Sequence, residues 1–119
     1  MENLVKEISL KKEVIGVYFF GSRVRGKFRQ DSDYDLCVIT EKISSKKEFE
    51  IIGHGDGIYQ VSLFHKLPLI IQFRIFKEGK LLFCRDEKKL NFLKLLTIKK
   101  YLDFFPFISK FYQRILKNV

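Results

Sequence analysis

The 119-residue sequence contains no tryptophan, no alanine, one methionine and only two cysteines, Cys37 and Cys84. Two cysteines in strand-like contexts are too few for a disulfide framework or a zinc site. No apolar run approaches the about 20 residues of a membrane-spanning helix. Segment 1–13 is charged throughout and lacks the apolar stretch of a signal peptide. We therefore expect a cytoplasmic protein with no membrane partner.

Apolar residues are plentiful by contrast. They make up 46% of the chain and include 13 Phe, a content that argues against intrinsic disorder. A chain of this length accommodates one hydrophobic core. We expect one domain over residues 1–119, with a core of about 1–85 and a C-terminal helical segment of about 86–119.

Positive charge is concentrated at the C-terminal end of the chain. The net charge is +9, and residues 88–119 hold eight Lys or Arg against Asp103 alone, which is eight minus one, or +7. Such a charge favours an acidic partner, RNA or nucleotide phosphates. A lysine-rich, solvated helix face explains it equally well, so RNA stays an open partner.

The spacing of apolar residues predicts strands and helices in mixed order. Strands are predicted over 14–20, 34–40, 58–64 and 81–84. Helices are predicted over 2–12, from Pro68 to about 76, from 86 to about 102, and again after a break or kink at Pro106. Segment 41–50 fits a helix or a loop, and Ser22 is expected to cap a helical turn over 23–26 before a polar loop over 27–32. The expected architecture is an α/β (α+β) fold with a small mixed sheet of about four strands flanked by helices.

Two short motifs carry the chemistry. Gly21 and Ser22 leave the predicted strand 14–20, where a glycine backbone, a hydroxyl and outward N–H groups suit a phosphate. Asp33 and Asp35 share one face at the start of the next strand, and their carboxylates repel each other unless a cation lies between them. Mg²⁺ is usually bound by one or two carboxylates together with substrate phosphates. Either motif alone is more often an ordinary turn, but together they indicate chemistry on a metal-bound nucleoside triphosphate.

Basic residues lie between the two motifs. Arg23, Arg25, Lys27 and Arg29 are close enough in sequence to hold triphosphate oxygens. We expect one or two of them, Arg25 among these, to bind the nucleotide, and the others to be surface charge.

Segment Gly21–Leu36 resembles the Gly-Ser … Asp-x-Asp signature of the DNA polymerase β-like nucleotidyltransferase superfamily. Its short form is similar to the minimal nucleotidyltransferases, with Val24 where the family usually has alanine. Residues 68–83 also resemble the family's segment after its third core strand, so the resemblance covers about residues 1–100. It implies a polymerase β-like core followed by C-terminal helices, ATP and Mg²⁺ as cofactors, and Asp33 and Asp35 as catalytic and metal-binding residues.

The resemblance also implies a partner. Many minimal nucleotidyltransferases are encoded with a HEPN-domain toxin ribonuclease and act as antitoxins that transfer AMP to a tyrosine of the toxin. By this analogy we expect a HEPN-type toxin as the acceptor, within a homo- or hetero-oligomer.

One family feature is missing. The family supplies a third carboxylate from its third core strand, and the expected position falls near Gln60. Glutamine retains an oxygen for a metal but carries no charge and cannot act as a base. Asp56 is the nearest substitute, although its place between glycines is explained by turn chemistry. Glu50, His54 and His65 are weaker candidates.

Three functions follow from these observations. The first is an ATP- and Mg²⁺-dependent protein adenylyltransferase that acts as an antitoxin. The second is a catalytically impaired nucleotide-binding antitoxin or partner-binding subunit, suggested by Gln60 and by an aromatic C-terminal cluster of Phe104, Phe105, Phe107, Phe111 and Tyr112. The third is nucleotidyl transfer to RNA or a small molecule, for which the short chain leaves little room for a second substrate domain.

Overall fold

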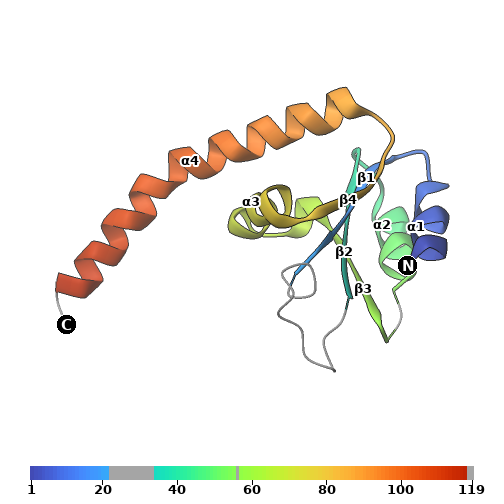
Figure 1. The fold of residues 1–119 in the computed structure, drawn as a ribbon, viewed down its shortest axis with the longest axis horizontal. Coiled ribbons are helices and arrows are strands. Elements are labelled where there is room, and N and C mark those ends of the chain that lie inside the picture. The colour runs from blue at the N-terminus through green and yellow to red at the C-terminus, as the bar shows by residue number, and fades with distance from the viewer. Residues whose placement is uncertain (22–33, 56, 118–119) are drawn as a thin grey trace.

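The computed structural model describes residues 1–21, 34–55 and 57–117, which form a four-stranded sheet with helices on both faces (Figure 1). The strand order is β3-β2-β1-β4. Strand β2 pairs parallel with β3, while β1 pairs antiparallel with both β2 and β4. The mixed sheet and its flanking helices confirm the predicted α+β class.

The first three elements agree closely with the prediction. Helix α1 (Glu2–Ser9) ends three residues before the predicted limit, and Ile8 is its buried residue. Strands β1 (Val14–Phe20) and β2 (Tyr34–Thr40) have the predicted bounds. Their nearly continuous apolar sequences suit the two central strands, which are covered on both faces. The predicted cap at Ser22 and the turn and loop over 23–32 lie outside the described residues.

Segment 41–50, which fitted either a helix or a loop, contains most of helix α2 (Ser45–Ile52). Ser44 caps this helix, and its side-chain oxygen accepts a hydrogen bond from the Lys47 N–H at 3.3 Å. Strand β3 (Tyr59–Leu63) is one residue shorter than predicted at each end. Phe64 instead begins a single 3₁₀ turn, η1 (Phe64–Lys66).

Helix α3 (Leu69–Glu78) corrects the prediction at both ends. Pro68 has ψ of 153° and is the N-cap, so it precedes the first helical position that it was expected to fill. The helix also continues two residues past the predicted end at 76, and the Gly79 N–H donates to the Ile75 carbonyl at 2.8 Å. Strand β4 (Lys80–Cys84) follows at once and starts one residue earlier than predicted.

Helix α4 (Glu87–Lys117) is one continuous helix that contains Pro106, so the predicted break there is wrong. Asp86 caps it as predicted, accepting a hydrogen bond from the Lys89 N–H at 3.2 Å. Proline removes one backbone donor, and Figure 1 shows the helix axis bending along its length, as a helix with an internal proline does. Within the described parts of the chain, no helix combines the length and apolar character needed to cross a membrane.

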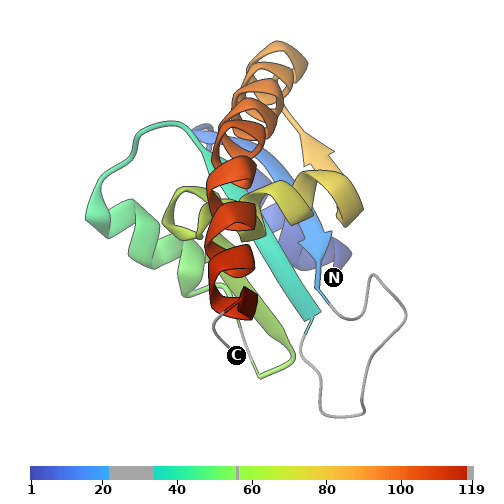
Figure 2. The same cartoon turned by 90° about the vertical axis from the view of Figure 1, so that its left-hand side faces the viewer.

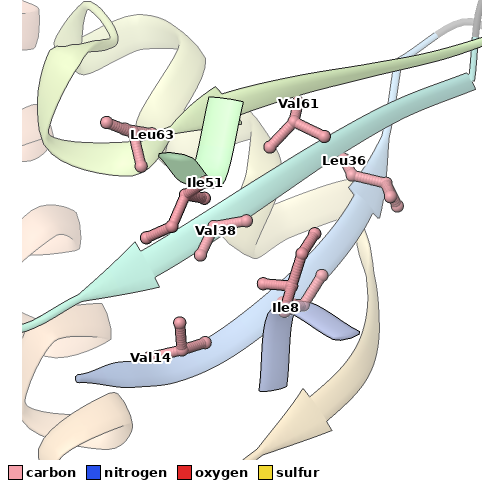
Figure 3. Close-up of a cluster of buried hydrophobic side chains, with 8 residues drawn as sticks. Ile8, Val14, Leu36, Val38, Ile51, Val61 and Leu63 are labelled. Atoms are coloured by element: carbon pink, nitrogen blue, oxygen red, sulfur yellow. The ribbon is translucent and has the colours of Figure 1, made fainter. Parts of the chain in front are cut away.

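The core has one hydrophobic cluster on each face of the sheet. On the face covered by α1 and α2, which we call the α1 face, the buried residues are Ile8, Val14, Val17, Leu36, Val38, Ile51, Val61 and Leu63 (Figure 3). On the opposite face, which we call the α3 face, they are Tyr18, Cys37, Ile39, Phe64, Ile75, Phe76 and Leu90. Cys37 and Cys84 are free thiols, and burial raises the pKa of Cys37. Alternate residues of β2 thus contribute to opposite clusters.

Candidate functional site

The ends of β1, β2 and β3 bring three side chains into one row, which we call the strand-end site. Phe20 of β1 pairs with Asp35 of β2, and Asp35 pairs with Gln60 of β3. Paired residues on neighbouring strands project from the same face. Cys37 and Ile39, two and four residues after Asp35, are buried on the α3 face. Asp35 and Gln60 therefore lie side by side on that face, one strand spacing of about 4.8 Å apart.

Gly21 leaves β1 next to the Asp35 carboxylate. Its φ is +96°, in a region that residues with a Cβ atom rarely adopt. A Cβ atom at this position would lie 2.4 Å from Asp35 Oδ2. Glycine is therefore required both for the backbone turn and for the space that the carboxylate occupies.

A small pocket adjoins this glycine. It has a volume of about 90 Å³ and is lined by Phe20, Gly21, Ile71, Arg74 and Glu78. Arg74 and Glu78 are one helical turn apart on α3, so this helix adds one positive and one negative side chain beside the strand-end site. A guanidinium group is well suited to binding phosphate oxygens. Neither residue was predicted from the sequence, because only the tertiary packing of α3 brings them next to Gly21.

Three aromatic rings support the same strand ends from the α1 face. The ring centroids of Phe19 and Tyr34 are 5.8 Å apart, and those of Tyr34 and Tyr59 are 5.4 Å apart. Such pairs contribute about 0.5–1.5 kcal/mol each beyond the area they bury. These ring contacts link the residues that immediately precede Phe20, Asp35 and Gln60 on the three strands.

Of the other predicted residues, seven lie outside the described part of the chain and three have partners elsewhere. Ser22, Arg23, Arg25, Lys27, Arg29, Asp33 and Asp56 lie outside the described residues. Glu50 pairs with Lys11 at 3.3 Å, and His54 lies 3.5 Å from Glu7 of α1. His65 lies 3.6 Å from Glu48 of α2. These contacts give Glu50 and the two histidines structural partners away from Gly21.

The donor atoms at the strand ends suit a hard divalent cation. Asp35 offers a carboxylate and Gln60 an amide oxygen, and Mg²⁺ prefers oxygen ligands. Across residues 1–21, 34–55 and 57–117, no three or more His, Cys, Asp or Glu side chains are grouped so that they could hold a metal ion. An ion bound between Asp35 and Gln60 would take its remaining ligands from groups other than these described side chains, and phosphate oxygens of a substrate are the usual ones for Mg²⁺.

Comparison with known proteins assigns the family. The family described as "Polymerase beta, Nucleotidyltransferase" matches residues 2–88. The chain belongs to this nucleotidyltransferase family. A curated relative, "Putative protein adenylyltransferase MJ1547" of Methanocaldococcus jannaschii, is 30% identical over 79 residues. The match covers 66% of this chain and 62% of the relative, so the chain spans less than two thirds of that protein's length.

Solved structures share the fold over nearly the whole chain, α4 included. A chain from a crystal structure of a toxin–antitoxin with AMP-PNP has a TM-score of 0.70 and 18% identity, over 99% of this chain and 97% of its own. A chain from the complex of the tri-AMPylated Shewanella oneidensis HEPN toxin with the MNT antitoxin has a TM-score of 0.63 and 18% identity. That match covers 100% of this chain and 98% of the other. The resemblance inferred from the Gly-Ser and Asp-x-Asp motifs is therefore confirmed.

Proposed function

We propose that this chain is a Mg²⁺-dependent adenylyltransferase that transfers AMP from ATP to a tyrosine of a HEPN-domain toxin and so acts as its antitoxin. The observation that carries the proposal is the pairing of Asp35 with Gln60 beside Gly21. Membership of the nucleotidyltransferase family supports the reaction class. The M. jannaschii relative and the AMPylated toxin complex support a protein as the acceptor.

The nucleotide would bind at the end of β1. The Gly21 backbone leaves room for phosphate oxygens beside the Asp35 carboxylate, and Ser22 would add its hydroxyl and N–H groups. Arg25, from the motif, and Arg74, from α3, would supply positive charge to the triphosphate. These assignments place the phosphates on the α3 face of the sheet.

Asp33 and Asp35 would hold Mg²⁺, with the Gln60 amide oxygen as a neutral third ligand. The bound ion would neutralise the triphosphate and favour in-line attack at phosphorus. In the transfer, the tyrosine oxygen forms a bond to the α-phosphorus while the bond to the bridging oxygen breaks and pyrophosphate leaves. The Gln60 amide cannot accept the phenolic proton, which passes to solvent or to a phosphate oxygen.

Label transfer from ATP tests this proposal. The purified chain, Mg²⁺, ATP labelled at the α-phosphate and the proposed HEPN-domain partner should give a labelled toxin. The double variant Asp33→Asn with Asp35→Asn should abolish the label, because both metal-binding carboxylates are lost. Absence of label with the wild-type chain, even at enzyme excess, contradicts catalysis.

Gln60 favours a second candidate, an antitoxin that binds nucleotide and neutralises its partner without transferring AMP. A neutral side chain next to Asp35 removes the charge and the base that a third carboxylate provides. Under this alternative, the Asp33→Asn/Asp35→Asn variant still neutralises the toxin. Failure of that variant to neutralise a toxin that it binds normally contradicts the alternative.

A further inference from the structure

Helix α4 has an inner part that packs on the protein and an outer part that continues past it. In the inner part, Leu90 and Thr97 are buried at 4% and 3% exposure. Tyr101 stacks on Phe73 of α3 with ring centroids 3.9 Å apart and planes 6° apart. Beyond this contact, residues 102–117 extend away from the sheet (Figure 1). The radius of gyration is 16.1 Å, against about 13.5 Å for a compact domain of this length.

The outer part carries an exposed apolar row that we call the outer stripe. It consists of Phe104, Phe107, Phe111 and Ile115, which are 43%, 70%, 58% and 45% exposed. Their spacing of three and four residues places them on one helix face, in line with Leu93, Thr97 and Tyr101 of the inner part. The line that packs on the body therefore continues into solvent, and large exposed apolar rows of this kind mark interaction sites.

The charges around the outer stripe indicate what kind of partner it binds. Residues 102–117 contain Lys110, Arg114 and Lys117 against Asp103, which is three minus one, or +2. A second copy of the chain, itself carrying +9, would place positive charge against positive charge. A partner with acidic residues around an apolar groove is complementary both to the stripe and to its basic border.

We propose that the outer stripe docks into an apolar groove rimmed by Asp and Glu on a protein partner. The mode is an amphipathic helix in a groove, read through anchors three and four residues apart, over about 16 Å from Phe104 to Ile115. That the partner is the HEPN-domain toxin rests on the proposed function.

The position of the helix gives the docking a consequence for the reaction. Figures 1 and 2 show α3 and α4 on the same side of the sheet, and Figure 1 shows the C-terminal end of α4 well apart from the strand ends that carry Asp35 and Gln60. The stripe continues the line of α4 that packs onto the α3 face. A partner bound to it therefore approaches the sheet from the face on which Asp35 lies.

Titration calorimetry with the HEPN-domain protein tests the docking surface. The variant Phe107→Glu with Ile115→Glu should bind at least about 30-fold more weakly than wild type, as expected when two interface anchors are lost. The matched control is Leu95→Glu with Leu102→Glu, because these residues are 68% and 59% exposed on the opposite side of the same helix. The control should bind like wild type, and both variants should bind ATP and unfold thermally like wild type.

Each other outcome has a definite meaning. Equal toxin binding by wild type and the Phe107→Glu/Ile115→Glu variant overturns the docking surface and leaves the adenylyltransferase proposal intact. A wild-type chain that binds ATP but not the toxin refutes the partner, and both proposals fail together. A homodimer in sedimentation analysis that only the Phe107→Glu/Ile115→Glu variant disrupts assigns the stripe to a second copy and overturns the acidic partner. Should that variant fail to fold, Lys110→Glu with Arg114→Glu must slow association and weaken its salt dependence, or the proposal is wrong.

Discussion

The strand-end site and the outer stripe of α4 are both parts of the molecule from which we infer function, yet they are held in different ways. At the strand ends, hydrogen-bonded pairing sets the neighbours, so that Asp35 lies between Phe20 and Gln60. In the outer stripe, the residues share one helix, and Phe104 and Phe107 have ring centroids 6.1 Å apart on a segment beyond the body. The first arrangement is rigid because three strands share it. The second depends on one helix.

The two regions therefore suit different tasks. The strand-end site suits the binding of nucleotide and metal, and the outer stripe suits the binding of a partner. A phosphate or metal site needs charged groups held within a fraction of an ångström, and paired strands provide that. A docking helix needs exposed apolar area, and it can be altered without moving the sheet. Substitutions at the strand ends should therefore impair nucleotide chemistry and leave partner binding unchanged, while substitutions in the outer stripe should do the reverse.

Gly21→Ala should have the largest effect on the strand-end site. A side chain at φ +96° costs about 1–2 kcal/mol, and the new Cβ would overlap Asp35 Oδ2 at 2.4 Å. Displacing the carboxylate by about 1 Å is expected to lower AMP transfer about 100-fold. ATP binding should weaken as well, while toxin binding measured by calorimetry stays as in wild type.

Gly57→Ala is the matched control, because a Cβ at Gly57 meets no atom within 4 Å. It should keep wild-type transfer and stability. Full activity of Gly21→Ala, or an equal loss in Gly57→Ala, would show that the Gly21 backbone does not shape the site. A loss of toxin binding in Gly21→Ala would show that the strand-end site and the outer stripe do not act independently.

Some parts of the strand-end site could be predicted from the sequence, and others could not. Strands β1 and β2 were predicted with their observed bounds because central strands have continuous apolar sequences with clear ends. Gln60 was found only through the family pattern. Its pairing with Asp35 depends on how β2 and β3 align, and no short sequence pattern specifies that alignment. Arg74 was missed because its proximity to Gly21 arises from tertiary packing. The roles of Ser22, Arg25 and Asp33 stay predictions.

The outer part of α4 was predicted as a separate helix because proline inside a helix costs about 3 kcal/mol. That cost is local, whereas the continuity of α4 depends on the helical residues on both sides of Pro106. Phe104, Phe107 and Phe111, which flank Pro106, were recognised as part of an aromatic cluster. Their exposure and their alignment with the packed line of α4 became visible only in the fold.

Arg74→Ala should have a smaller effect, confined to nucleotide binding. Loss of one charge-assisted hydrogen bond to phosphate weakens binding by about 1.5–3 kcal/mol, or at least about 10-fold. Titration calorimetry should show weaker binding of ATP and unchanged binding of the toxin. Lys77→Ala is the control, since it removes the same charge from an exposed position on α3 outside the pocket. An equal loss in both variants would mean that α3 contributes only a general positive field.

Gln60→Asp should have the smallest effect and the opposite sign. It places a carboxylate beside Asp35 on the α3 face, where we predict that the family's third acid falls. With Mg²⁺ present, the added charge should strengthen metal binding, and the new base should assist loss of the phenolic proton. We expect label transfer to the toxin to rise several-fold, most clearly at low Mg²⁺, with no change in toxin binding.

Gln60→Asn is the control, because it matches the size of Asp without its charge and should not accelerate transfer. Equal rates for Gln60→Asp and wild type would show that the register neighbour of Asp35 is not the limiting ligand. If both proteins transfer AMP at the same measurable rate, a group other than Gln60 limits catalysis, and the non-catalytic candidate loses the observation that favours it.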